Sequence, residues 1–398
     1  RKLVNHTYEG FDIQPIYSRR DESGGEDPLG FPGLAACIRG TKPLGAVQSG
    51  WDLRQDFADP SPTVANKAIL NDLMGGVTSV HLQLDQAARN GLDPDAPETE
   101  LSGKTGLMAY CVDDLDDALA NVQLDLIQIG IDAGAAFLPA AAVLVGLWQR
   151  RNISSDQARG SFNADPLATL AKAGQLPIPA TTAMSMMADL AKWTSGNYPH
   201  VTSVGVDTTT YHDAGATAAQ DIAFAAASGV EYLRAMTDAG LDTEAAARQI
   251  LFRFGIGTHH FMSIAKLRAA RWVWSRVIEA SGGSPQSCPM RIHARTGNRV
   301  LTQRDPYVNL LRNSVAVFAA GLGGADIITS VPFDAIAGVP DNFSRRVARN
   351  TLLVLQEESH LNRVIDPAGG SWFLDQLTQD LATNAWQIFQ ETERNGGM

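Results

Sequence analysis

The stretch VGVDTTTYHDAGAT, residues 204–217, joins an apolar run to polar side chains and then to small residues. The run Val204–Thr210 is β-branched and apolar, which is typical of a buried strand. Asp213 is placed to cap a helix and Gly229 to end it. One face of that helix would carry Ala218, Ile222, Ala225 and Ala226. The stretch therefore predicts a strand that delivers polar groups to a pocket and is followed at once by a helix.

The same alternation of apolar runs and helical segments continues through most of the chain, and His259–Ala280 has the strongest helical periodicity. No glycine-rich dinucleotide-binding fingerprint accompanies it, so the pattern favours an α/β fold of the (β/α)₈ TIM-barrel type over a doubly wound sheet. We expect the barrel at residues 46–398 and an irregular N-terminal arm, rich in Pro, Gly and acidic residues, at residues 1–45. The predicted strands are Gly45–Val47, Thr78–Leu84, Leu107–Val112, Leu126–Asp132, Val201–Thr209, Pro289–Ala294 and Ala325–Ser330.

The composition is that of an ordinary globular protein, with 398 residues of which 44% are hydrophobic and 19% charged. A net charge of −11 argues against nucleic-acid and anionic-membrane partners, because both require clustered Lys and Arg. The most apolar run, Ala133–Trp148, is short for a membrane span and contains Pro139, which predicts a buried strand or helix. Because no signal peptide opens the chain, we expect a cytoplasmic protein. Cys37, Cys111 and Cys288 are widely spaced, which predicts small buried thiols.

Three potential cations alternate along one predicted strand. The sequence MRIHARTG, residues 290–297, places Arg291, His293 and Arg295 on one side of that strand, just before a glycine turn. Such a row on one face of a barrel strand indicates either an anion or phosphate contact or a structural ion pair, and both interpretations stay open.

Two segments, one acidic and one with adjacent histidines, contain residue types that can bind a metal ion. The sequence CVDDLDDALA, residues 111–120, contains four aspartates, but acidic residues in a first turn complement the helix dipole and favour a helix start. His259 and His260 are adjacent, so on a helix they would point about 100° apart and could not chelate one ion. We therefore predict no metal site.

Several longer motifs resemble those of the methylmalonyl-CoA mutase family, and the resemblance extends from about residue 10 to the end of the chain. The motifs are RGTKPLGAVQSGWDLRQ (39–55), AGAT (214–217), GIGTHHFMSIAKLRAAR (255–271), VARNTLLVLQEES (347–359), VIDPAGGSW (364–372) and GGM (396–398). The resemblance implies a (β/α)₈ barrel that holds an acyl-CoA along its bore and is stacked on a cobalamin domain. It also implies an isomerase that interconverts methylmalonyl-CoA and succinyl-CoA with adenosylcobalamin as the source of a radical.

The sequence departs from the catalytic members of this family at three positions. Alignment on AGA, residues 214–216, places Thr210 at the catalytic histidine, and we expect His212 to face away from that position. Asp56 replaces the tyrosine that packs between substrate and corrin, and Ala173 replaces the arginine that binds the substrate carboxylate. Asp56 would moreover bring a negative charge near a second one in a water-poor bore, where like charges at about 4 Å repel by several kcal/mol. We therefore expect no catalytic residues in this chain.

Attachment of cobalamin in this family uses the histidine of a D-x-H-x-x-G motif. None of the eight histidines of this chain has an aspartate two positions before it. We therefore expect the cobalamin-binding domain to be absent from this chain, no cofactor to be bound by the chain alone, and adenosylcobalamin to be held by a partner large subunit.

The resemblance and the three substitutions favour the small, catalytically inactive subunit of a heterodimeric methylmalonyl-CoA mutase. Such a chain would stabilise the large catalytic subunit through an interface of roughly 2,000 Å² or more in total, with its N-terminal arm wrapped around the partner. The side chains that remain from the substrate site are expected to be vestigial and structural, namely Arg54, Gln55, His212, Arg291, His293 and Glu358.

Two alternatives stay open. The first is an active acyl-CoA mutase barrel for an isobutyryl-type substrate, paired with a separate cobalamin-binding subunit. The missing histidine at Thr210 counts against it, because all these substrates share the thioester carbonyl. The second is a binding module that uses the barrel for CoA or another ligand, supported by Arg291, His293 and Arg295.

Overall fold

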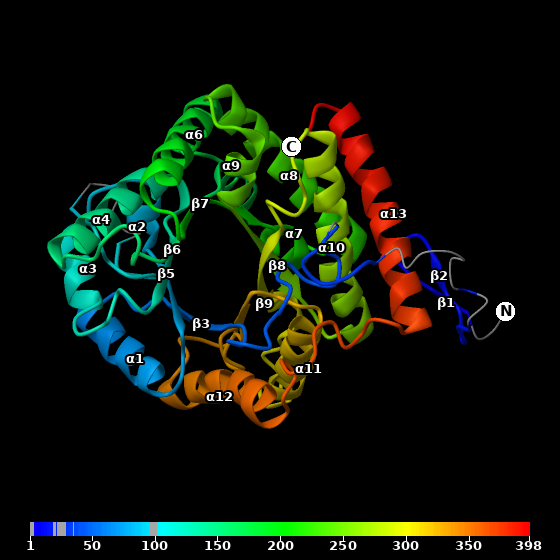
Figure 1. Cartoon of the computed structure of the whole chain (residues 1–398). Coiled ribbons are helices and arrows are strands. Elements are labelled where there is room, and N and C mark those ends of the chain that lie inside the picture. The colour runs from blue at the N-terminus through cyan, green and yellow to red at the C-terminus, as the bar shows by residue number, and fades with distance from the viewer. Residues whose placement is uncertain (1–3, 19–20, 22–28, 35, 96–101) are drawn as a thin grey trace.

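The computed structural model describes the chain except for residues 1–3, 19–20, 22–28, 35 and 96–101. Eight parallel strands close into a barrel in the order β10-β3-β4-β5-β6-β7-β8-β9, and helices surround it (Figure 1). The predicted (β/α)₈ barrel is confirmed. The barrel strands are β3 Asp52–Phe57, β4 Ser79–Gln83, β5 Gln128–Asp132, β6 Gly160–Ala164, β7 Val201–Asp207, β8 Ile250–Ile256, β9 Arg291–Thr296 and β10 Ile327–Thr329.

Five of the predicted strands are confirmed within a few residues, namely β4, β5, β7, β9 and β10. Two predictions were wrong. Gly45–Val47 forms turns, with Gly45 at φ 50°, and the segment Leu107–Val112 contributes a single bridge from Leu107 to Leu84 before a helix begins at Val112. Apolar character alone therefore did not identify a strand.

The prediction missed β3, β6 and β8 because each carries polar or small residues that face the bore. In β3 the sequence DLRQDF alternates polar and apolar positions only in part, since Gln55 is also polar and donates to the backbone of Arg345 in the helix layer. In β8 Arg253 interrupts the apolar run ILFRFGI. Strands of a barrel whose bore is polar therefore lack the continuous apolar signal expected of parallel sheets.

The outer layer consists of helices of very different lengths. The segment α10 is buried on nearly every side because α8, α11 and α13 pack against it, and this confirms the predicted helix over 259–280. The bounds are α1 Pro62–Met74, α2 Gln86–Arg89, α3 Val112–Ala118, α4 Phe137–Arg150, α5 Pro166–Ala173, α6 Ala180–Asn197, α7 Thr209–Asp213, α8 Ala218–Asp238, α9 Thr243–Arg248, α10 His260–Ala280, α11 Val308–Leu322, α12 Asn342–Leu353 and α13 Trp372–Arg394. Short 3₁₀ turns lie at Gly134–Ala136 and Asn298–Val300, and a π-helical turn at Val354–Glu358 follows α12.

Residues 204–217 fold differently from the prediction. The strand β7 ends at Asp207, and the next residues form the short helix α7. Thr217, and not Asp213, caps α8, because its hydroxyl accepts a hydrogen bond from the backbone of Gln220 in a capping box. Gly229 lies inside α8 and does not end it, and the close Trp274 ring leaves no room for a side chain at this position.

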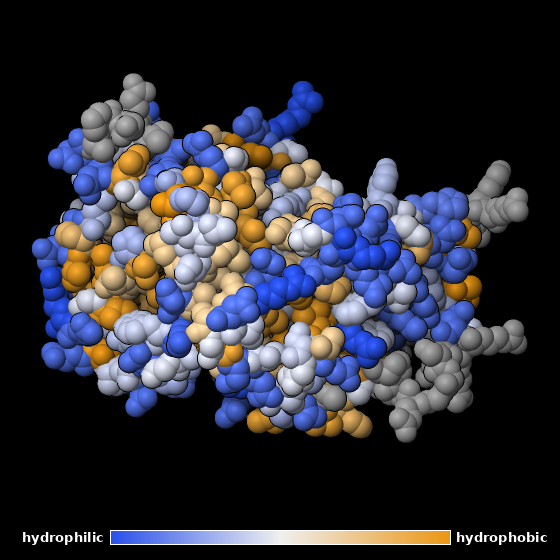
Figure 2. Space-filling view, turned by 90° about the horizontal axis from the view of Figure 1, so that it is seen from above, coloured by the Kyte–Doolittle hydropathy of each residue, from blue (hydrophilic) through white to orange (hydrophobic). Residues whose placement is uncertain are grey.

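The acidic segment 111–120 forms the start of helix α3, as predicted, and its cap is Cys111. The expectation of a buried thiol was wrong for Cys111, which is exposed, whereas Cys37 and Cys288 are buried. No helix in the part of the chain that the structure describes is long and apolar enough to cross a membrane. Figure 2 shows hydrophilic and hydrophobic residues interspersed over the face in view.

The described part of the N-terminal arm lies against α8 and α13. Its antiparallel strands β1 Asn5–His6 and β2 Asp12–Ile13 lie outside the helix ring, beside α13 (Figure 1). The buried Glu9 carboxylate accepts hydrogen bonds from the first backbone N–H groups of α8, at 2.9 Å from Ala218 and 2.8 Å from Ala219. Asn384 of α13 donates to the Glu9 carbonyl oxygen. The predicted arm also includes residues 1–3, 19–20, 22–28 and 35, which lie outside the described residues.

Because α8 and α10 pack closely at Gly229, adding a methyl group at this position should destabilise the fold. A side-chain carbon at Gly229 would lie 2.6 Å from the Trp274 ring, so Gly229→Ala should lower the free energy of unfolding by about 1–3 kcal/mol. Gly196 of α6 has open space around it, and Gly196→Ala should raise stability by up to about 1 kcal/mol through helix propensity. Urea denaturation of both variants checks this, and equal effects would contradict the packing described.

Candidate functional site

Asp56 links three strands across the bore. Its Oδ2 lies 2.9 Å from Nε of Arg295 on β9, and its Oδ1 lies 3.1 Å from Nδ1 of His81 on β4. The His81 side chain is almost entirely buried, and those of Asp56 and Arg295 are mostly buried. The negative charge expected in the bore is therefore present, but it is paired with a guanidinium and does not stand alone.

The chain of contacts continues to the opposite wall of the barrel. Nε2 of His81 lies 3.4 Å from Nη1 of Arg253 on β8, and Arg253 forms an ion pair with Asp207 at the end of β7. Because arginine has no acceptor, His81 must accept at Nε2 and carry its proton at Nδ1, where it donates to Asp56. We call the five side chains Arg295, Asp56, His81, Arg253 and Asp207 the bore network.

The charges of the bore network follow from these contacts. Burial alone would raise the pKa of Asp56, but Arg295 and the His81 hydrogen bond hold it well below its usual range. Likewise, Arg253 overcomes the effect of burial and lowers the pKa of Asp207 to about 2. Burial lowers the pKa of His81. The bore network therefore holds two carboxylates, two guanidinium groups and a neutral imidazole at neutral pH.

Below the bore network, toward the amino ends of the strands, lies Arg54. Its Nε donates to Oγ of Ser79 at 2.7 Å, and burial lowers its pKa to about 10. Its Nη1 and Nη2 have no hydrogen-bond partner among the described residues. Arg291 lines a separate pocket at the amino ends of β7 and β9, so it lies far along the bore from Arg295.

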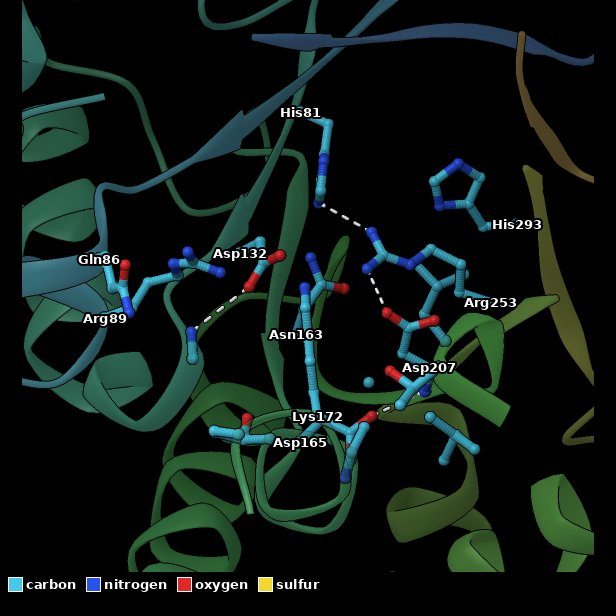
Figure 3. Close-up of a pocket in the computed structure, with 18 of the residues that line it drawn as sticks. His81, Gln86, Arg89, Asp132, Asn163, Asp165, Lys172, Asp207, Arg253 and His293 are labelled. Atoms are coloured by element: carbon cyan, nitrogen blue, oxygen red, sulfur yellow. Dashed lines mark hydrogen bonds and ion pairs between the residues drawn. The ribbon is translucent and has the colours of Figure 1, made fainter. Parts of the chain in front are cut away.

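Above the bore network, at the carboxyl ends of the strands, the barrel opens into a cavity of about 290 Å³ (Figure 3). We call it the mouth cavity. His81, Arg253 and His293 form part of its lining, and the rest consists of glycines and apolar residues together with further charged and polar side chains from the strand ends and the loops and helices that follow them. The latter side chains include Gln86, Arg89, Asn90, Asp132, Asn163, Asp165, Thr169, Lys172, Asp207 and Thr210.

Asp165 is a structural carboxylate at the edge of the mouth cavity. It caps α5 at Ala168 at 3.0 Å, accepts from the Tyr232 hydroxyl at 2.5 Å, and accepts from the backbone of Asp207 at 2.7 Å. Burial raises its pKa to about 7 in spite of these donors. Its oxygens are therefore engaged with the protein and hold β6, β7 and α8 together.

Two of the three positions at which we expect the sequence to depart from catalytic members of the family line the mouth cavity. Ala173, at the end of α5, offers only a methyl group, and Thr210, in α7, offers a hydroxyl. The third position, Asp56, belongs to the bore network. The structure thus brings the three positions to the upper half of the bore and its mouth.

His212 lies behind the wall of the barrel. Its buried ring packs where side chains at Gly255 and Gly297 would stand, and its Nδ1 lies 3.4 Å from Asp221, which also pairs with Lys266. Because residues 209–213 are helical and not extended, the ring is turned away from the mouth cavity that Thr210 lines. His212 therefore has a packing role in this structure.

The remaining predicted residues are spread over three regions. Gln55 faces the helix layer and donates to the Arg345 carbonyl at 3.1 Å, and Glu358 is exposed at the end of the π-helical turn. His293 lies in the bore, 2.8 Å from Oγ1 of Thr329, and burial with the nearby Arg54 holds its pKa well below the usual range. Of the row on β9, the structure brings His293 and Arg295 to the upper bore and leaves Arg291 below.

Sequence reasoning missed the other half of the site. Arg253 and His81 were detectable as ionisable residues inside apolar runs, ILFRFGI and SVHLQ, where an unpaired charge would be costly. Asp132 and Asp207 were detectable as polar residues at the last position of a barrel strand, where active sites of this fold lie. Lys172 carried no signal, because an exposed lysine near a helix end is common. No group of three potential metal ligands occurs among the residues described.

Comparison with known proteins connects this geometry to one family. Residues 6–398 match the family model for methylmalonyl-CoA mutase. The chain is 43% identical to a methylmalonyl-CoA mutase small subunit of Streptomyces virginiae over 98% of its length and 58% of the relative. It is 37% identical to the methylmalonyl-CoA mutase small subunit of Propionibacterium freudenreichii subsp. shermanii, over all of this chain and 58% of the relative. It is 32% identical to the methylmalonyl-CoA mutase of Escherichia coli K12, over all of this chain and 56% of the relative. The chain thus spans little more than half the length of these relatives.

The bore network predicts a large effect of neutralising Asp56. In Asp56→Asn the Arg295 guanidinium loses its counter-charge in a mostly buried site, which should cost roughly 3 kcal/mol of the free energy of unfolding. The matched control is Asp113→Asn, which breaks the exposed pair with Arg150 and should cost less than about 1 kcal/mol. Chemical denaturation of both variants measures the difference, and a change for Asp56→Asn as small as the control would contradict the network.

The ion pair of Asp207 and Arg253 should make the free energy of unfolding depend on pH in a defined direction. The pKa of Asp207 is about 2 in the folded chain and about 4 when unfolded, so its stabilising contribution is full above pH 4 and is lost as the pH falls toward 2. The difference in unfolding free energy between the wild type and Asp207→Asn should therefore shrink between pH 4 and pH 2. A difference that stays constant over this interval would show that Asp207 has no lowered pKa.

Proposed function

The chain belongs to the methylmalonyl-CoA mutase family, and from this premise we propose that it is the barrel of a small subunit without catalytic activity of its own. Its function in this proposal is to stabilise a large subunit that catalyses the interconversion of methylmalonyl-CoA and succinyl-CoA. The names of two small-subunit relatives support the assignment. The proposal that the barrel is inactive rests mainly on the bore network.

The bore network is the single observation that argues most strongly against acyl-CoA in this barrel. An acyl-CoA that passes along the bore must occupy the space between β3, β4, β7, β8 and β9, where the five side chains are joined. Opening that path would separate Asp56 and Asp207 from their arginine partners in a water-poor site. The cost of unpairing buried charges opposes such an opening.

The functional groups that line the mouth cavity also argue against catalysis on an acyl-CoA in this barrel. A substrate thioester carbonyl would need a donor such as an imidazole, and Thr210 offers only a hydroxyl. Ala173 offers no cation for a free carboxylate, and the cations nearby in the cavity, Arg89 and Lys172, share it with the Asp132 carboxylate. The histidines in the bore are already engaged, His81 with Asp56 and His293 with Thr329. These contacts favour a structural role over the alternative of an isobutyryl-type mutase.

The residues present do not fit adenosylcobalamin. The sequence has no D-x-H-x-x-G motif, and the buried His81 is held by Asp56 in the bore and His212 by Asp221 in the helix layer. We therefore assign the cofactor to the large subunit and derive no step of the reaction from this chain. Three free cysteines in the described chain are compatible with a reducing compartment, and we place the protein in the cytoplasm.

The proposal predicts both an assembly and an inactive barrel within it. The chain should co-purify from its host in a one-to-one complex with a longer relative that carries tyrosine, arginine and histidine at the positions of Asp56, Ala173 and Thr210. Alone it should show no mutase turnover with added adenosylcobalamin.

Variants of the complex test which of its two barrels catalyses the reaction. Thr210→Val in this chain should leave the kcat of the complex unchanged, because no reacting atom meets Thr210. The matched change, of the corresponding histidine in the longer relative to valine, should abolish turnover. A more than tenfold loss of kcat in Thr210→Val, or turnover by the isolated chain, would refute the proposal.

A further inference from the structure

Three charged side chains in the mouth cavity make no ion pair with any described residue. They are Arg89 of α2, Asp132 at the end of β5 and Lys172 of α5. The Nε atom of Arg89 is buried and has no hydrogen-bond partner in the described part of the chain. Figure 3 shows the Arg89 side chain extending toward Asp132 across the cavity.

These three groups leave an excess of positive charge. Asp132 lines the same cavity as Lys172, Arg253, His81 and Arg89, and these groups hold its pKa below the usual value although burial would raise it. Of the cations among them, Arg253 is already paired with Asp207. Two cations and one carboxylate therefore remain, and they face the same space.

The rest of the lining is suited to hydroxyl groups. Nδ2 of Asn163 donates to the Ile131 carbonyl at 2.9 Å, which orients the Asn163 side chain. Amides and hydroxyls from α2, α5 and α7 complete the wall, namely those of Gln86, Asn90, Thr169 and Thr210. Such groups both donate and accept, so they complement a ligand with several hydroxyls.

The dimensions of the cavity restrict the ligand to a compact molecule. At about 290 Å³ the cavity lies just below the usual range for ligand pockets, roughly 300–1,000 Å³. Its floor is formed by His81, Arg253 and His293, so a long tail cannot continue down the bore. A ligand must enter from the carboxyl ends of the strands.

We propose that the mouth cavity binds a small phosphorylated polyol, with its phosphate between Arg89 and Lys172 and a hydroxyl donating to Asp132. A phosphate monoester carries nearly two negative charges, which matches two unpaired cations better than a single carboxylate does. The site goes beyond the structural role proposed above and does not depend on it, because it needs neither the partner subunit nor mutase turnover.

Calorimetric titration of the purified chain with glycerol 2-phosphate tests the site. The chain should bind this probe, and Lys172→Ala should weaken binding at least tenfold. Because Lys172 is exposed, its loss should leave folding intact. The matched control is Lys67→Ala on the exposed face of α1, outside the cavity, which should bind as the wild type does.

Further probes separate the parts of the site. Glycerol without phosphate should not bind, and inorganic phosphate should bind more weakly than glycerol 2-phosphate because it lacks the hydroxyls. Asp132→Ala should remove that difference. Absence of binding at millimolar probe, equal binding by Lys172→Ala and the wild type, or tighter binding of glycerate than of glycerol 2-phosphate would overturn the proposal.

Discussion

The pairing of Asp56 with Arg295 and His81 is the interaction on which the other features of the bore depend. A carboxylate buried alone in a barrel would be protonated or expelled, because burial disfavours its charged form. With a guanidinium at 2.9 Å and an imidazole N–H at 3.1 Å it remains ionised. The orientation of His81 then fixes Nε2 as the acceptor for Arg253, and through Arg253 the contact reaches Asp207.

This arrangement divides the bore into two regions with different properties. Below it, Arg54 and Arg291 face the amino ends of the strands, and above it the mouth cavity retains unpaired charges. A path for a long acyl chain requires both regions to be joined. Asp56, which was expected from the sequence to bring a repelling negative charge into the bore, instead forms the ion pair and hydrogen bond that lie between the two regions.

The sequence was sufficient to predict the barrel, but not the contacts across its bore. Apolar β-branched runs such as VTSVGVD were recognised, whereas GSFNA of β6 was missed because its small and polar residues have low strand propensity. Asp213 was assigned as a cap because local pattern cannot distinguish it from Thr217, which the fold selects. The bore network joins residues up to 239 positions apart, and such pairings depend on the closure of the barrel.

Direct titration of the chain with methylmalonyl-CoA, followed by calorimetry, tests most directly whether the bore is closed to its family's substrate. The account predicts no binding at micromolar concentrations, because the tail would have to displace paired Asp56, His81 and Arg253. Micromolar binding, with protection of the bore-facing strands from hydrogen exchange, would contradict it.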